Sequence, residues 1–165
     1  MSWILQINAS YDTAKNADGC ASKAAFFPAA SVDDIARAEA RLKVTLPQSL
    51  RSLLLETNGV MAMLSVNKSN WFENMWLIFP IDEIVAENSR YRAGATDRPY
   101  QDNLHQVLFF AGAGCDGILF GFPMNPDLTC EQSVVVWHPM RDTLSSTAES
   151  LDAFIVGWLD GTIKV

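Results

Sequence analysis

The segment of this chain whose spacing most suggests chemistry is rich in glycine. Gly112-x-Gly114-x-x-Gly117 matches the dinucleotide-binding fingerprint, in which the last glycine lies in a helix whose N-terminus binds a pyrophosphate. Residues 118–122 read instead as an apolar strand, and no acidic residue stands about twenty positions further on. We therefore predict a hairpin turn over 112–117 and no nucleotide cofactor.

Cys115 lies in the same turn and is a candidate nucleophile, with His105 or His138 as its general base. Such chemistry requires a lowered thiol pKa and a histidine within hydrogen-bond reach. Asp116 stands next to Cys115, and its negative charge disfavours the thiolate. A thiol enzyme is therefore the weakest of the functions considered, and we expect a protein that is not an enzyme.

Metal sites and disulfides have little support in the sequence. The three cysteines are an odd number and lack C-x-x-C spacing, which argues against a disulfide framework and a structural zinc site: Cys20, Cys115 and Cys130. The two histidines stand far apart, without the H-E-x-x-H pattern. Asp33-Asp34 and Asp82-Glu83 fall at expected helix starts, where the helix dipole favours acids. We expect no catalytic set, cofactor or metal.

Charge is the clearest compositional signal. The 165 residues are 49% hydrophobic and 19% charged, as in a single soluble globular domain. The net charge of −7 is uneven, because residues 1–70 carry a balance of +1 and residues 71–165 carry −8. An acidic half repels phosphates, which argues against nucleic acid as a direct partner. It would attract a basic protein, and the alternative interpretation is that the charge only keeps the chain soluble.

Membrane and export signals are not evident. No apolar run approaches membrane-spanning length, and the run Trp3 to Ile7 is too short for a signal peptide and lacks a basic start. Reduced thiols fit a reducing compartment. We expect a cytoplasmic protein with no membrane partner.

The strongest secondary-structure pattern is a helical hairpin. Ser31 with Asp33 and Asp34 predicts a helix start, and this helix should end near Lys43. Its expected inner stripe is Val32, Ile35, Ala38 and Leu42. A second helix should begin at Pro47, bury Leu50, Leu53, Leu54 and Thr57 at helical spacing, and close at Asn58-Gly59.

The remaining elements alternate strands and helices. We predict strands at 3–7, 75–79, 107–111, 118–122 and 133–137, and a helix at 81–92. A last helix should open with a capping box of Ser146 and Glu149 and close at Asp160-Gly161. The order predicts a single α+β domain: a mostly antiparallel or mixed sheet of about four to six strands covered by helices.

The helical hairpin carries a family resemblance. Its motifs are Ile35-x-x-x-Glu39-x-x-Leu42, Leu46-Pro47, Leu50-x-x-Leu53-Leu54 and Asn58-Gly59. They resemble the SUKH superfamily, which is named in part for the yeast regulator of cell-wall synthesis and includes many bacterial toxin-immunity proteins. The resemblance covers residues 31–161, leaving 1–30 as an N-terminal extension or lead-in strand and 162–165 as a C-terminal tail. It implies an α+β fold, no known catalysis and a protein partner, typically a toxin and often a nuclease. A regulatory or scaffolding module with another partner is the alternative.

Glu39 lies near the apolar stripe of its helix, where a half-buried carboxylate must be hydrogen-bonded. Backbone N–H groups or an arginine are the expected donors. We expect a structural bracket here, with a ligand site as the alternative. The structural motif of the hairpin then consists of Glu39, Leu46, Pro47, Asn58 and Gly59.

Candidate partner-binding residues fall in three connecting segments. Trp71 and Phe72, in a loop over 65–74, have side chains favoured as interface anchors, unless they fold back onto the core. The long segment 93–105 carries Arg98, Tyr100 and Asp102. The loops between the later strands carry Asp116, Asp127 and Glu131, an expected acidic patch for a basic toxin domain.

Overall fold

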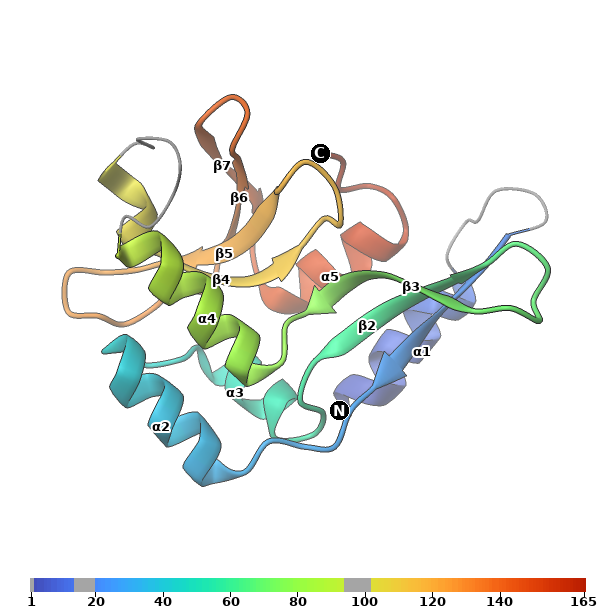
Figure 1. Ribbon diagram of the computed structural model, residues 1–165, viewed down its shortest axis with the longest axis horizontal. Coiled ribbons are helices and arrows are strands. Elements are labelled where there is room, and N and C mark those ends of the chain that lie inside the picture. The colour runs from blue at the N-terminus through green and yellow to red at the C-terminus, as the bar shows by residue number, and fades with distance from the viewer. Residues whose placement is uncertain (1, 14–19, 94–101) are drawn as a thin grey trace.

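Two antiparallel sheets form the framework of the protein, in a computed structural model that describes residues 2–13, 20–93 and 102–165 (Figure 1). The first sheet has the strand order β1-β2-β3, with β1 at Ala21–Phe26, β2 at Val60–Ser65 and β3 at Phe72–Ile78. The second has the order β4-β5-β6-β7, with β4 at Val107–Gly112, β5 at Leu119–Pro123, β6 at Val134–His138 and β7 at Thr143–Ala148. The Phe79 N–H donates to the Phe110 carbonyl at 2.8 Å and links the two sheets.

Five α-helices cover these sheets. They are α1 (Trp3–Thr13), α2 (Val32–Leu42), α3 (Gln48–Leu54), α4 (Ile81–Arg92) and α5 (Leu151–Leu159), and a short 3-10 helix, η1, spans Asp102–Gln106. The α+β class predicted from the sequence is confirmed. The described residues form seven strands in two sheets, however, whereas the sequence predicted about four to six strands in one. Residues 21–26 and 143–148, which form the outer strands β1 and β7, contain small and polar residues without the apolar pattern of a buried strand.

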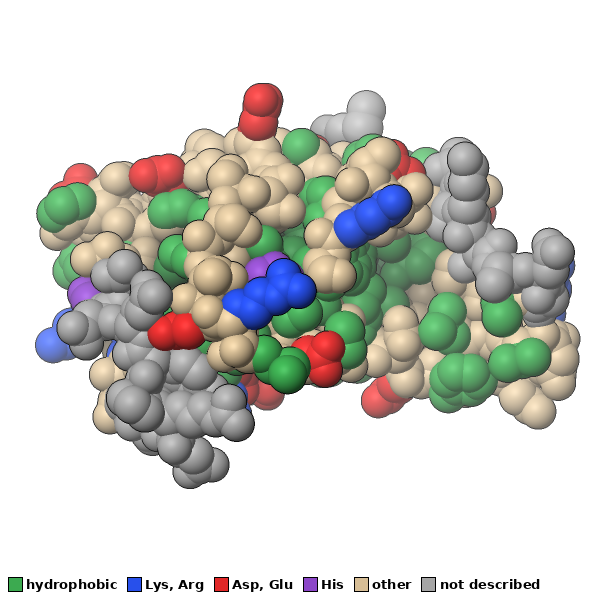
Figure 2. All heavy atoms as spheres, turned by 90° about the horizontal axis from the view of Figure 1, so that it is seen from above, with side chains coloured by type: hydrophobic (Ala, Val, Ile, Leu, Met, Phe, Trp, Pro, Cys, Tyr) green, Lys and Arg blue, Asp and Glu red, His purple; other side chains and the backbone are tan. Residues whose placement is uncertain are grey.

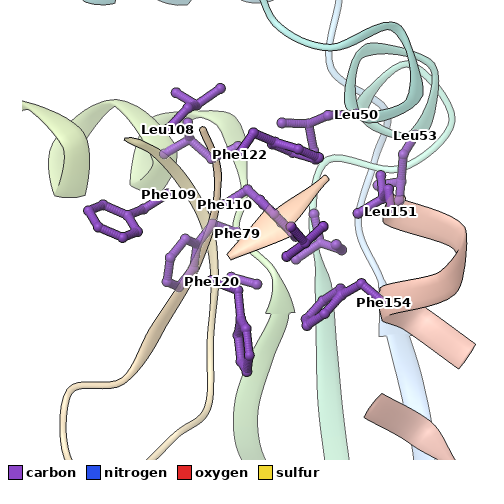
Figure 3. Packing of buried hydrophobic residues seen from close by; sticks show 14 of the residues in the cluster. Leu50, Leu53, Phe79, Leu108, Phe109, Phe110, Phe120, Phe122, Leu151 and Phe154 are labelled. Carbon is purple, nitrogen blue, oxygen red and sulfur yellow. The ribbon is translucent and has the colours of Figure 1, made fainter. Parts of the chain in front are cut away.

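The four-stranded sheet is covered on both faces. On one face, Tyr91 of α4 packs edge-on against Trp137, with ring centroids 5.0 Å apart. On the other, Phe154 of α5 packs against Phe110 and Phe120 at 5.5 and 4.7 Å. Figure 3 shows Phe110, Phe120 and Phe154 in one cluster with Leu50 and Leu53 of α3, which are fully buried. The helical hairpin and the four-stranded sheet therefore share one core.

The N-terminal segment differs from its prediction. Residues 3–7, expected as a strand, begin helix α1, which lies behind the three-stranded sheet in Figure 1. Trp3, Ile7 and Tyr11 are buried at a helical spacing of four residues. The Glu56 carboxylate accepts hydrogen bonds from the first N–H groups of the helix, those of Trp3 at 2.8 Å and Ile4 at 3.1 Å. This distant cap satisfies donors that a helix leaves free at its start.

The start and end of α2 agree with the sequence prediction, whereas one residue of its inner stripe and the cap of α5 do not. Ser31 and Asp34 form a capping box on α2, and Lys43 ends it at φ 51°. Val32 is 57% exposed, so its expected place on the inner stripe was wrong. Helix α5 is capped by Ser150 rather than Ser146, which lies in β7.

Helix α3 is shorter than expected. It begins at Gln48, one residue after Pro47, and ends at Leu54. Thr57 is fully buried as predicted, but it lies outside the helix. Its hydroxyl accepts a hydrogen bond from the Phe27 N–H at 3.0 Å, so Thr57 attaches the end of the hairpin to the segment after β1.

Candidate functional site

The hairpin motif is used inside the fold. Glu39 of α2 accepts a hydrogen bond from the Leu46 N–H at 3.0 Å through one oxygen. Its other oxygen pairs with Arg51 Nη1 of α3, also at 3.0 Å. These are the two kinds of donor that the sequence predicted. Because both carboxylate oxygens have partners within the hairpin, this part of the molecule reads as structure rather than as a binding site.

Asn58 and Gly59 attach the hairpin to α4. The Asn58 Oδ1 accepts a hydrogen bond from the Ile81 N–H, the first of α4, at 2.8 Å. Gly59 has φ +98°, and a Cβ at this position would lie 2.9 Å from the Pro80 nitrogen. Only glycine combines that backbone angle with so close an approach. The pair therefore positions the start of α4 as well as ending the hairpin.

The three acidic residues expected to form one patch are not brought together. Asp116 lies in the turn between β4 and β5, whereas Asp127 and Glu131 lie in the connection between β5 and β6. These two connections join opposite ends of the five-residue strand β5. The expected single acidic patch is thus divided between two ends of the sheet.

Asp127 and Glu131 have local partners. The Asp127 carboxylate accepts from the Thr129 hydroxyl at 2.6 Å and the Thr129 N–H at 3.0 Å. These bonds from Thr129 hold the pKa of Asp127 below its usual value. Glu131 accepts from the Ser133 hydroxyl at 2.9 Å. Both carboxylates thus order their own loop.

The aromatic pair expected as an anchor is divided between a partly covered ring and an exposed one. Trp71 is partly buried, and Lys23 Nζ of β1 lies 4.1 Å from its ring centroid, a cation–π contact. Phe72 begins β3 and is 49% exposed. Of the third group, Arg98 and Tyr100 lie outside the described residues, and Asp102 begins η1.

A hollow of about 500 Å³ opens between the two sheets, where β3 faces the turn 112–118. Its lining is mostly apolar, with two carboxylates: Met61, Glu73, Asn74, Met75, Trp76, Phe79, Gly112, Gly114, Cys115, Asp116, Gly117, Ile118 and Leu119. Figure 2 looks down on the molecule from above Figure 1 and shows hydrophobic side chains in the middle of this face. Glu73 and Asp116 are exposed, while Phe79, Ile118 and Leu119 are buried.

The glycine-rich turn has a packing role at this hollow. The prediction of a hairpin turn is confirmed, since β4 and β5 pair antiparallel on either side of it. Gly114 has φ +75°, and a Cβ there would lie 2.7 Å from the Met75 Cβ. A side chain at 114 would therefore push the turn away from β3.

Cys115 and His138 both line a smaller hollow of about 190 Å³ on the other side of the turn. The structure describes both side chains, and no hydrogen bond joins them. Cys130 is a different kind of thiol, because burial raises its pKa to about 12, opposed by the nearby Arg92 guanidinium. Within the described part of the chain, no three His, Cys, Asp or Glu side chains are grouped to hold a metal ion. No described helix is both long and apolar enough to cross a membrane.

The sequence singled out Asp116 at the main hollow but missed its opposite wall. Glu73 and Trp76 come from β3, fully forty residues before Asp116 along the chain. The available signal was the sequence of residues 72–78, which has polar Glu73 and Asn74 near its start and apolar Leu77 and Ile78 at its end. In the structure the first three residues of this strand are exposed and the last two are buried. Such a strand leaves the core partway and presents side chains to solvent.

The hairpin with its internal Glu39 bracket, on two antiparallel sheets, defines an α+β protein of the SUKH type. The chain belongs to the SMI1/KNR4 family (SUKH-1), whose family model matches residues 29–157. This family is generally non-catalytic, and membership supports a toxin-immunity or related binding module. No curated protein matches the chain.

Proposed function

We propose that this protein is a cytoplasmic immunity protein that neutralises a cognate bacterial toxin by binding it directly. Family membership supports a binding module, and the toxin is the partner that the SUKH resemblance implies. A bound protein can block a toxin by covering its active surface, so the function requires a complementary surface and no catalytic residue.

The observation that carries the proposal is the hollow between β3 and the turn 112–118. It joins an apolar lining, suited to anchoring side chains, with the exposed carboxylates of Glu73 and Asp116 at its margin. A basic surface with protruding side chains is complementary to this arrangement.

The acidic balance of the chain supports the same kind of partner. Residues 71–165 carry −8, and this half includes both carboxylates of the hollow. A toxin that acts on nucleic acid carries a basic surface to bind phosphates. Opposite charges would speed its encounter with this protein and make the association rate fall with added salt.

Co-expression tests the proposal. The chain is produced in bacteria together with each toxin encoded beside its gene, and survival is compared with cells that lack the chain. We expect the chain to rescue cells from one of these toxins and to form a complex with that toxin of micromolar or tighter affinity. Binding without rescue would favour the regulatory or scaffolding alternative. Failure of both rescue and binding with every neighbouring toxin would overturn the immunity function.

A further inference from the structure

We propose that the hollow between β3 and the turn 112–118 receives an arginine side chain from a loop of the partner protein. This inference rests on the proposed function for the identity of that partner. It names the chemical group that the site recognises, which family membership does not.

The charges around the hollow point to a cation. Glu73 comes from β3 and Asp116 from the turn, so the two carboxylates lie on separate walls. The described residues that line the hollow include no Lys, Arg or His. Both carboxylates are exposed, and no side chain of the described residues forms an ion pair with either. An anionic ligand would be repelled, and a neutral apolar one would remove water from the carboxylates without compensation.

The lining favours a guanidinium over other cations. Trp76 lines the hollow with a partly buried ring that also packs against Phe27, with ring centroids 5.2 Å apart, while Phe79 and Met61 form part of the buried lining. Met75 is only partly buried and adds a flexible thioether that can adapt to a guest. A guanidinium stacks on aromatic faces and donates hydrogen bonds to carboxylates in its own plane, whereas an ammonium is a compact, strongly hydrated charge.

The hollow is large enough to receive one long side chain. Its volume is about 500 Å³, and the turn closes one side of it where Gly114 approaches Met75. One long side chain can enter there while its backbone stays on the rim. If that side chain is an arginine of the toxin's active site, the toxin cannot use it in its own reaction while the arginine is bound in the hollow.

Peptide binding observed by NMR tests the inference without a toxin. The probe is the capped tripeptide acetyl-Gly-Arg-Gly-amide, titrated to millimolar concentration into ¹⁵N-labelled protein. Amide shifts should concentrate at 73–76 and 112–118. The same peptide with citrulline, which keeps the shape and loses the charge, should bind at least tenfold more weakly. The lysine peptide should fall between the two.

Matched variants locate the contact. Glu73→Gln and Asp116→Asn should each weaken the arginine peptide about fivefold, as expected for one exposed charge contact. Asp127→Asn removes an equal charge at the opposite end of β5 and should leave affinity unchanged. Trp76→Leu should reduce the preference for arginine over lysine. Equal binding of the citrulline peptide, shifts centred elsewhere, or an equal effect of Asp127→Asn would overturn the inference.

The two proposals fail separately. If wild-type protein rescues cells from a toxin and the Glu73→Gln, Asp116→Asn double variant rescues equally well, the arginine site is wrong and immunity stands. If the peptide binds the hollow as described but no toxin is neutralised, the arginine site stands and immunity is wrong.

Discussion

Glu39 on α2 and Arg51 on α3 form an ion pair with 3.0 Å between Oε2 and Nη1. The two side chains are 20% and 29% exposed, so water screens the pair only in part. The other Glu39 oxygen accepts from the Leu46 N–H. One carboxylate thus fixes the connection between the helices and the first turn of α3.

This arrangement predicts unequal effects of two substitutions. Glu39→Ala should lower the free energy of unfolding by about 2 kcal/mol, because the Leu46 N–H loses its acceptor. Glu39→Gln keeps an acceptor oxygen and should cost less than about 1 kcal/mol. Urea unfolding at pH 7 measures both, and a cycle with Arg51→Ala should give a coupling of about 0.5–1 kcal/mol. Equal losses for the Gln and Ala variants would show that the backbone bond contributes little.

Asn88 predicts a larger loss in the core. Its side chain accepts from the Phe109 N–H at 2.9 Å and donates to the Phe109 carbonyl at 2.8 Å, and the residue is 1% exposed. Asn88→Ala leaves both backbone groups of Phe109 without this partner and should cost about 3 kcal/mol. Asn70→Ala, in the exposed β2–β3 loop, is the control and should stay within about 0.5 kcal/mol. Equal denaturant midpoints, within error, for the wild type and Asn88→Ala would contradict the role of Asn88.

Gly114 and Gly161 provide a matched pair. Their φ angles are +75° and +79°, but a Cβ at 114 would lie 2.7 Å from Met75 Cβ, whereas one at 161 would meet nothing within 4 Å. Gly161→Ala should therefore cost only the backbone strain, about 1–2 kcal/mol. Gly114→Ala should cost more, and it should also displace the turn and weaken any partner bound in the hollow. Calorimetry compares the two variants, and an equal loss would mean that the turn moves away freely.

Local signals explain the parts of the fold that the sequence predicted well. Helix α2 was placed because its cap and its apolar spacing lie within a dozen residues. Helix α4 was placed from Pro80 and the acidic residues of its first turn, Asp82 and Glu83, although its N-terminal cap, Asn58, is distant. Helix α1 was missed because its N-terminal cap, Glu56, stands more than fifty residues away. Strands β1 and β7 were missed because a strand at the edge of a sheet needs no continuous apolar pattern.

The site was harder to predict for a related reason. Asp116 was singled out from its turn. That Glu73 lines the same hollow depends on how the two sheets meet, which no local spacing encodes. The separation of Asp116 from Asp127 could have been predicted from the expected strands. A single strand stands between their loops, and successive connections of a meander alternate between the two ends of a sheet. Strand order thus decides which loop residues can share a surface.

Glu56 predicts an acid-sensitive attachment of α1. The Ser2 hydroxyl and then the N–H groups of Trp3 and Ile4 donate to this carboxylate and lower its pKa from the usual 4.5. A lowered pKa stabilises the folded state above about pH 4.5, and this stabilisation is lost as the pH falls through the folded-state value. The protection factors of the α1 amides, which correct for the pH dependence of intrinsic exchange, should therefore fall below pH 4.5 in the wild type.

Glu56→Gln should remove most of that pH dependence while making α1 exchange faster at pH 7. Glu149→Gln, an exposed carboxylate just before α5, is the control and should keep the wild-type profile. Protection factors of α1 in Glu56→Gln that follow the wild-type pH profile would show that other carboxylates govern the attachment.

The cysteines separate a binding module from the thiol enzyme considered at the outset. Cys115 is exposed, whereas Cys130 is partly buried with a pKa raised to about 12 by burial. Iodoacetamide at pH 7.5 should label Cys115 at the rate of an ordinary exposed thiol and leave Cys130 unlabelled until the protein unfolds, because the thiolate is the reacting form. Mass spectrometry of peptides follows each site, and His138→Ala should leave the Cys115 rate unchanged. A Cys115 rate far above that of a free cysteine peptide, and reduced by His138→Ala, would mean that the turn holds an activated nucleophile.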